Sequence, residues 1–210
     1  MNNTEIAKFN MIEQQIRPWE VLDHQVLAVI EKLNREDFVD PLYQGLAYAD
    51  CQIPVANGVH MLPPTVEGRM LQALVLASDD EVLEVGSGSG YISACLASLA
   101  GHVRSIDANA DIIERAQANV SHLGLEPLEF EQMSLAQLDA PENYDAIAVT
   151  ASLAGVPQNL KQALKIGGRM FIICGDSPAM EALLITRVGA NEWSTQSLFE
   201  TDLPRLQVIG

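Results

Sequence analysis

Three closely spaced glycines mark the part of the chain whose residue types best suit ligand chemistry. Residues 82–91 read VLEVGSGSGY, so an apolar run leads into Gly86, Ser87, Gly88 and Gly90 and then into a helical pattern. Glycines let a backbone approach a ligand closely, and a strand, a glycine-rich turn and a helix in this order bind nucleoside cofactors in open α/β folds. The spacing therefore predicts a nucleoside-binding turn.

Two acidic residues indicate which nucleoside the turn would bind. The dinucleotide fingerprint is G-x-G-x-x-G, whereas the third glycine here comes one residue early, which disfavours a pyrophosphate. Glu84 lies two residues before Gly86, where its charge would repel phosphates but attract an ammonium or sulfonium group. Asp107 ends the next predicted strand, where a carboxylate can accept hydrogen bonds from both ribose hydroxyls. S-adenosylmethionine carries both cations and a ribose, so we predict it as the cofactor.

Alternating strand and helix patterns after residue 80 predict the fold that would position this turn. Short apolar runs, separated by helical stretches, indicate five strands at residues 81–85, 103–106, 128–131, 146–150 and 170–174. Such alternation is typical of a parallel sheet. Residues 182–188 and 193–199 flank a Gly-Ala-Asn turn and predict an antiparallel hairpin at the sheet edge. The predicted fold class is therefore α/β, with a doubly wound, mostly parallel, seven-stranded Rossmann-like sheet.

The first 78 residues have a different texture. Helical patterns at 4–16, 23–33 and 65–77 accompany a stretch from 41 to 64 that Pro and Gly punctuate as a loop. We expect residues 1–78 to form a helical and loop-rich extension that serves as a substrate lid, and residues 79–210 to form the Rossmann-like core of one compact domain. Trp19 belongs either to this lid or to the hydrophobic core.

The composition excludes several classes of partner. The chain has 210 residues, with 28 Asp plus Glu against 12 Lys plus Arg, and a formal net charge of −16. Nucleic acids and anionic membranes bind clustered basic residues, so neither is an expected partner. The three cysteines lack metal-ligand spacing, and the N-terminus lacks the basic and apolar segments of a signal peptide. We therefore expect a cytoplasmic monomer without a structural metal.

Motifs spread over nearly the whole chain point to one family. They are MIEQQI at 11–16, REDFV at 35–39, AYAD at 47–50, the glycine turn, YDAIAVTA at 144–151 and LKIGGR at 164–169. With these motifs the chain resembles the protein-L-isoaspartate O-methyltransferase family of class I S-adenosylmethionine-dependent methyltransferases. The resemblance implies a cofactor pocket built from the glycine turn with Glu84, from Asp107 with Ala108, and from the backbone around Met133 and Ser134.

Two segments depart from the family's pattern. The family's substrate loop has the form G-x-T-I-S-x-P, and residues 58–64 read GVHMLPP, so Leu62 occupies the position of the serine beside the substrate carboxyl. His60 is the candidate replacement donor, and its alternative is a structural or solvent-facing role. After the third strand the family has Gly-Asp-Gly, whose Asp contacts adenine, where this chain has QMSL at 132–135.

The resemblance implies methyl transfer to the carboxylate of isoaspartyl residues in damaged protein. A carboxylate is ionised at neutral pH, so this reaction needs positioning and no general base. Thr150 and Ser152 lie at the end of the fourth strand. They either face the ligand crevice, in which case Thr150 binds the cofactor, or they cap the next helix.

Three alternatives to this function remain open. Leu62 makes the acceptor pocket more apolar, which suits another protein or peptide group or a small molecule. A noncatalytic relative that binds the cofactor is the second alternative. A nicotinamide dehydrogenase is the third, and the glycine spacing and Glu84 both disfavour it.

Overall fold

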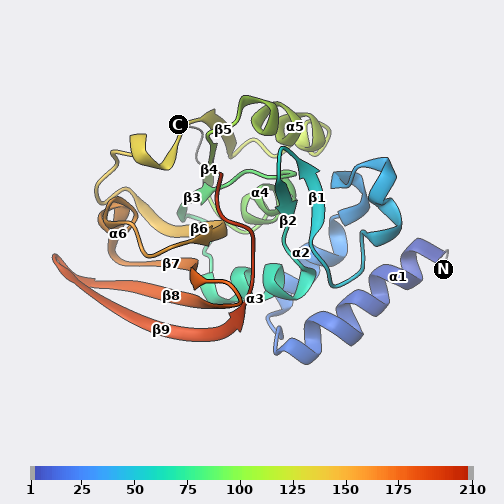
Figure 1. The fold of residues 1–210 in the computed structure, drawn as a ribbon, viewed down its shortest axis with the longest axis horizontal. Coiled ribbons are helices and arrows are strands. Elements are labelled where there is room, and N and C mark those ends of the chain that lie inside the picture. Colours follow the sequence, from blue (N-terminus) through green and yellow to red (C-terminus); the bar gives the residue numbers. More distant parts are fainter. Residues whose placement is uncertain (1–2, 208–210) are drawn as a thin grey trace.

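The computed structural model describes residues 3–207 and contains a seven-stranded sheet with helices on both faces (Figure 1). The strands follow the order β5-β4-β3-β6-β7-β8-β9 across the sheet. The first five strands in this order pair in parallel, whereas β8 pairs antiparallel with β7, and β9 pairs antiparallel with β8. Their bounds are β3 Glu81–Val85, β4 His102–Asp107, β5 Leu128–Gln132, β6 Tyr144–Leu153, β7 Leu164–Asp176, β8 Ala179–Gly189 and β9 Glu192–Thr201. The predicted doubly wound α/β sheet with a C-terminal hairpin is confirmed.

The strands at the hairpin end of the sheet are longer than predicted. β7 has 13 residues and includes the predicted strand at 170–174, while β8 and β9 each extend beyond the predicted hairpin strands. The apolar runs reveal only the buried centre of each strand, whereas ladder hydrogen bonds also order the half-exposed ends. The helix that follows β6 is short, α6 Gln158–Ala163, because Leu164 already pairs with Tyr144 as part of β7.

Helices cover both faces of the sheet. α3 (Pro64–Leu74) packs against β6 and β7, and α4 (Tyr91–Ala97) and α5 (Ala110–Val120) pack against β4 and β5 beside it. α6 packs against β7 in the cluster on the opposite face. Along β3, Val82 belongs to the cluster under α3 and α4, whereas Leu83 and Val85 belong to the cluster under α6. Alternate residues of the central strands thus fill two separate hydrophobic cores.

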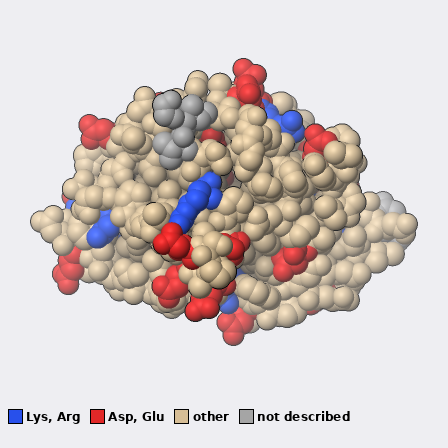
Figure 2. Space-filling model, in the orientation of Figure 1, with Lys and Arg blue, Asp and Glu red and all other residues tan. Residues whose placement is uncertain are grey.

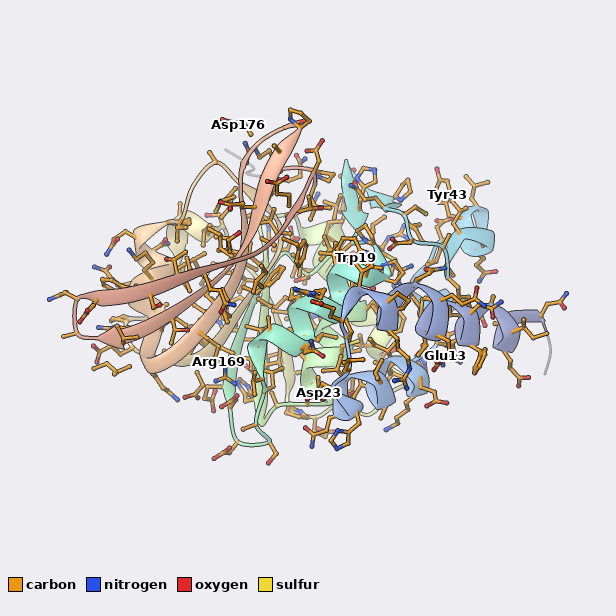
Figure 3. The ribbon with its side chains drawn as sticks, turned by 90° about the horizontal axis from the view of Figure 1, so that it is seen from below. Glu13, Trp19, Asp23, Tyr43, Arg169 and Asp176 are labelled. Atoms are coloured by element: carbon orange, nitrogen blue, oxygen red, sulfur yellow. The ribbon has the colours of Figure 1, made fainter. Side chains whose placement is uncertain are left out.

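The N-terminal helices lie beside the core under α3 and α4, and three of them contribute buried residues to it. They are α1 Asn3–Asn10, the π-helical η1 Met11–Ile16, α2 His24–Lys32, and the 3₁₀ turns η2 Arg17–Trp19, η3 Arg35–Phe38 and η4 Pro41–Leu46. Buried side chains of η1, α2 and η3 belong to the same cluster as Val82 and Phe171 of the sheet. Trp19 is 40% exposed and stacks edge-on against Phe199 of β9, near α3 (Figure 3). The role of residues 1–78 as a substrate lid stays a prediction.

Residues 41–64 contain a hairpin that we expected to be loop. β1 (Ile53–Ala56) and β2 (Val59–Met61) pair antiparallel around Asn57 and Gly58, whose φ angles are 51° and 78°. Two residues with positive φ form the turn type that matches the twist of a two-stranded ribbon, and Asn-Gly is its preferred sequence. The dipeptide was therefore the signal that could have predicted this hairpin. The helix expected at 65–77 ends at Leu74, because Val75 adopts a left-handed conformation with φ of 44°.

The C-terminal segment, residues 202–207, crosses the carboxyl ends of the central strands (Figure 1). Ser152 at the end of β6 fixes it: its hydroxyl donates to the carbonyls of Leu203 (2.8 Å) and Pro204, and its carbonyl accepts from the Leu206 N–H (2.9 Å). Ser152 is fully buried and therefore neither faces a ligand nor caps a helix. Both expected roles of this serine are wrong. Its hydrogen-bond partners lie about fifty residues further along the chain, so the neighbouring sequence does not reveal them.

Candidate active site

Two adjoining cavities lie at the carboxyl ends of β3, β4 and β6. Cavity A lies between the glycine turn, β2 and the C-terminal segment; cavity B lies between β4, the start of η5 (Leu135–Gln137) and α6. Gly86, Asp107, Leu206 and Gln207 line both cavities. The two cavities therefore meet beside the glycine turn and under the C-terminal segment.

The structure brings nearly all of the predicted site residues to these cavities. Cavity A is lined by His60, Leu62, Glu84, Gly86, Ser87, Gly88, Asp107 and Thr150, and cavity B by Gly86, Asp107, Ala108, Met133 and Ser134. Gly90 lines neither cavity. A Cβ there would lie 2.9 Å from the Ala116 carbonyl oxygen, so this glycine allows α4 to pack closely on α5. The structure thus shows a packing role for Gly90, and its contact with the cofactor stays a prediction.

Thr150 holds the glycine turn from the end of β6. Its hydroxyl donates to the carbonyl of Gly86, and a Cβ at Gly86 would lie 2.5 Å from the same hydroxyl oxygen. Gly88 differs, because a Cβ there would meet no atom within 4 Å although the residue lines cavity A. The backbone at Gly88 therefore leaves open space where a ligand can approach the turn.

Glu84 is completely buried beneath the turn. Ser93 of α4 and Ser105 of β4 both donate to its Oε2, whereas Oε1 is buried without a hydrogen-bond partner among the described residues. Burial raises the pKa of this carboxyl to about 8, although the two serine hydrogen bonds lower it. Glu84 is therefore mostly protonated at neutral pH, and not the permanent negative charge that we expected. An ammonium group next to Oε1 would stabilise the ionised form and give that oxygen a partner.

Replacing Glu84 with glutamine should make the free energy of unfolding less dependent on pH. The carboxyl has a pKa of about 8 in the folded protein against an ordinary value of 4.5, so the folded chain holds a proton that the unfolded chain releases. Its contribution to stability is complete below the unfolded pKa and is lost as the pH rises through the folded one. Urea denaturation between about pH 5 and about pH 8.5 should show a larger loss for wild type than for Glu84→Gln. Equal losses would contradict this assignment.

Asp107 lies where the two cavities meet. It is 7% exposed at the end of β4, and the Asn109 backbone N–H donates to its Oδ1 (2.9 Å). Burial raises the pKa of Asp107, while backbone N–H groups of Asn109, Ser87 and Gly88 lower it and partly compensate. A carboxylate held by backbone groups at this strand end is placed to accept hydrogen bonds from ligand hydroxyls in either cavity.

His60 and Leu62 occupy different environments on the same side of cavity A. His60 lies on β2, with its Nδ1 3.1 Å from the Gly58 carbonyl oxygen and its ring partly exposed. Leu62 is 5% exposed and belongs to the core under α3, although it also lines the cavity. Leu62 therefore gives this position an apolar surface and no side-chain hydrogen-bond donor.

A buried ion pair holds the segment with Leu62 in place. The Arg35 guanidinium donates from Nε to Glu67 of α3 (3.0 Å), from Nη1 to the Ala47 carbonyl (2.6 Å) and from Nη2 to the Leu62 carbonyl (2.6 Å). Both charged side chains are buried. The motifs at 35–39 and 47–50, quoted above only for resemblance, thus meet at one side chain that fixes the wall of cavity A.

Ser134 and Met133 contribute to cavity B through the backbone and through packing. The Ser134 hydroxyl and backbone N–H both donate to Gln137 Oε1, which caps η5, and the Met133 N–H donates to the Asp107 carbonyl (2.9 Å). Asn159 of α6 also lines cavity B and donates to the Leu135 carbonyl (2.7 Å). Sequence reasoning missed Asn159, because α6 approaches η5 only in the folded chain.

The position of the cavities defines the class of the protein. β3 lies between β4 on one side and β6 on the other, so chain order reverses there, and open α/β sheets bind ligands at such a switch point. A glycine turn after β3 and a carboxylate at the end of β4 are the features of a nucleoside-binding protein with a Rossmann-like methyltransferase fold.

Comparison with known proteins gives the family. The profile of the protein-L-isoaspartate(D-aspartate) O-methyltransferase family (PCMT) matches residues 6–201, and the chain belongs to this family. It is similar to the protein-L-isoaspartate O-methyltransferase of Rhodopseudomonas palustris, with 37% identity over 90% of this chain and 87% of that one. A second relative of that type, from Pelobacter propionicus, is 33% identical over 94% of this chain and 89% of that one.

The fold agrees with a solved structure over its full length. A Plasmodium falciparum structure assigned to the same enzyme type, in complex with S-adenosyl-L-homocysteine, superposes with a TM-score of 0.81. The match covers 99% of both chains at 18% identity, so it supports the fold. Among residues 3–207, no helix has the length and apolar character that a membrane span requires, and no cluster of three or more His, Cys, Asp or Glu could bind a metal ion.

Proposed function

We propose that this protein uses S-adenosylmethionine to methylate the carboxylate of isoaspartyl residues in damaged protein. The observation that supports this most strongly is the meeting of cavities A and B at Gly86 and Asp107, in a chain of the isoaspartate methyltransferase family. A two-part site of this kind has room for a nucleoside on one side of the junction and for an acceptor on the other.

The residues at the junction suit this cofactor. Asp107 would accept hydrogen bonds from the ribose hydroxyls, and Glu84 has an unpartnered buried oxygen that suits the ammonium group. The open backbone at Gly88 would allow close approach of the ligand. Cavity B, with Ala108, Met133 and Ser134, would receive the adenine. When bound, S-adenosylmethionine supplies an activated methyl group.

The contribution of the chain to the reaction is to position the acceptor and exclude water. A carboxylate acceptor is already ionised at neutral pH, so no side chain has to remove a proton. Met61, Leu62 and Tyr91 give cavity A apolar walls, and the C-terminal segment covers it at Leu203 and Leu206. Few waters can compete with the acceptor in such a cavity, so orientation can supply several kcal/mol of catalysis.

We also propose that the protein acts as a monomer in the cytoplasm. Its three cysteines, Cys51, Cys95 and Cys174, are all free thiols, which suits a reducing compartment. A protein or peptide carboxylate is the proposed acceptor.

Calorimetric titration with S-adenosylhomocysteine and radiolabelled methyl transfer in the same preparation test this function. We expect binding of the nucleoside, and methyl transfer to an isoaspartyl peptide but not to its normal aspartyl twin. Binding with transfer to neither peptide would refute the isoaspartyl acceptor and direct the search to other acceptors or to a noncatalytic role. The absence of nucleoside binding would refute the proposed cofactor itself.

A further inference from the structure

The C-terminal segment brings one arginine to cavity A. Arg205 lines this cavity, and its Nη2 donates to Asp176 Oδ1 at 2.7 Å. Its Nη1 is buried and has no hydrogen-bond partner among the described residues. A buried guanidinium nitrogen without an acceptor is costly, and a carboxylate is the acceptor that best satisfies it.

The backbone on both sides of Arg205 is fixed. Ser152 accepts from the Leu206 N–H (2.9 Å), and its own N–H donates to the Pro204 carbonyl (3.0 Å). The next residue, Gln207, approaches the β1–β2 turn, where a Cβ at Gly58 would lie 3.5 Å from the Gln207 Nε2. Arg205 is thus presented from a segment that is anchored to β6, and not from a free tail.

The charges around cavity A make Arg205 distinctive. Among the described residues that line this cavity, it is the only Lys or Arg, and the acidic residues there are Glu67, Glu84 and Asp107. Glu67 is already paired with Arg35. Basic side chains are also few on the face shown in Figure 2. Among the described lining residues, Arg205 therefore offers an anionic acceptor the one Lys or Arg charge, on a side chain that is 38% exposed.

The side chain of Leu62 cannot donate a hydrogen bond to an acceptor carboxylate. Leu62 lines cavity A at 5% exposure, and its side chain has no hydrogen-bonding group. His60 contacts its own turn through the Gly58 carbonyl. Arg205 remains as the cavity residue with an unpartnered, charged donor.

We propose that Arg205 binds the carboxylate of the methyl acceptor and so selects a charged over a neutral acceptor. This inference rests on the proposed function in that it takes a carboxylate as the acceptor. The existing partner of Arg205 presents little competition, because Asp176 lies at the exposed end of β7 with a side chain that is 93% exposed (Figure 3). Such surface pairs are weak, so Nη1 can engage the acceptor whether or not Nη2 stays paired.

The test compares acceptor binding to wild type, Arg205→Gln and Arg17→Gln, each saturated with S-adenosylhomocysteine. Arg17 is a matched control, because it is a partly exposed arginine paired with an acid, Glu13, and does not line cavity A. The ligands are an isoaspartyl peptide and the same peptide with the free α-carboxylate of the isoaspartyl residue replaced by an amide. Nucleoside affinity is measured for all three proteins and should be unchanged, which reports an intact site.

We expect wild type and Arg17→Gln to bind the carboxylate peptide about 10- to 100-fold more tightly than the amide, and Arg205→Gln to lose this preference. A general loss of structure would weaken the binding of both peptides equally. A lost preference for the carboxylate peptide is therefore specific to charge recognition. If Arg205→Gln keeps the full preference, the inference is overturned while the proposed function stands.

If wild type binds neither peptide, a separate titration tests whether Arg205 binds a carboxylate. Glutarate and its diamide are then the probes, with binding followed by NMR of isotope-labelled protein. Glutarate binding that is lost in Arg205→Gln supports a carboxylate site although the isoaspartyl acceptor has failed. Equal binding of glutarate by both proteins, or its absence in both, overturns the inference.

Discussion

Gly88→Ala is expected to weaken the binding of S-adenosylhomocysteine by about 100-fold while the protein remains folded. A Cβ at this position meets no protein atom within 4 Å, so the added methyl group does not disturb the core. It would instead occupy space in cavity A, where we propose that the backbone of the turn approaches the nucleoside. The φ of Gly88 is 52°, which adds a conformational cost of about 1 kcal/mol for alanine.

Gly124→Ala separates the loss of ligand space from backbone strain. Gly124 follows α5, has a φ of 61° and has no atom within 4 Å of its Cβ position, but it lines neither cavity. Calorimetry and urea denaturation should therefore show similar losses of stability in the two variants, and a loss of affinity only in Gly88→Ala. Unchanged affinity in Gly88→Ala would show that the turn does not contact the nucleoside.

Glu67→Gln is expected to lower the free energy of unfolding by about 3 kcal/mol or more. Glu67 is buried against Arg35, which also donates to the Ala47 and Leu62 carbonyls and so cannot leave for water without breaking both contacts. The variant keeps the size of the side chain but leaves a buried guanidinium without its counter-charge. Urea denaturation at neutral pH measures the loss.

The control for this variant is Glu20→Gln. Glu20 pairs with Arg69 at 3.1 Å, but its side chain is 83% exposed, so the pair should contribute less than about 1 kcal/mol. Similar losses in the two variants would mean that burial does not strengthen the Arg35–Glu67 pair. Because Arg35 holds the Leu62 carbonyl, Glu67→Gln should also reduce peptide binding at temperatures where the protein stays folded.

The parts of the site that the sequence predicted depend on short stretches of chain. Gly86 and Gly88 belong to one turn, and Asp107 ends the strand that follows it, so their positions relative to the sheet are given by strand and helix patterns. The seven strands and their mostly parallel order could be predicted for the same reason. Residue types at fixed spacing suffice where local geometry places the side chains.

The protonation and the hydrogen-bond partners of the side chains in the site depend on contacts between residues that are distant in the sequence. Glu84 loses its charge at neutral pH because α4 and β4 bury it, and Arg35 reaches Glu67 across 32 positions of the chain. Ser152 binds a segment about fifty residues further on and thereby presents Arg205 to cavity A. No local pattern encodes these contacts.

The sequence by itself therefore determined the family, the sheet and the glycine turn. The tertiary structure decided which of the predicted carboxyl groups are buried, which predicted residue has a packing role, as Gly90 does, and which unpredicted residue, Arg205, lines cavity A. The physical reason is that backbone conformation follows from neighbouring residues, whereas desolvation and charge pairing depend on every segment that folding brings together.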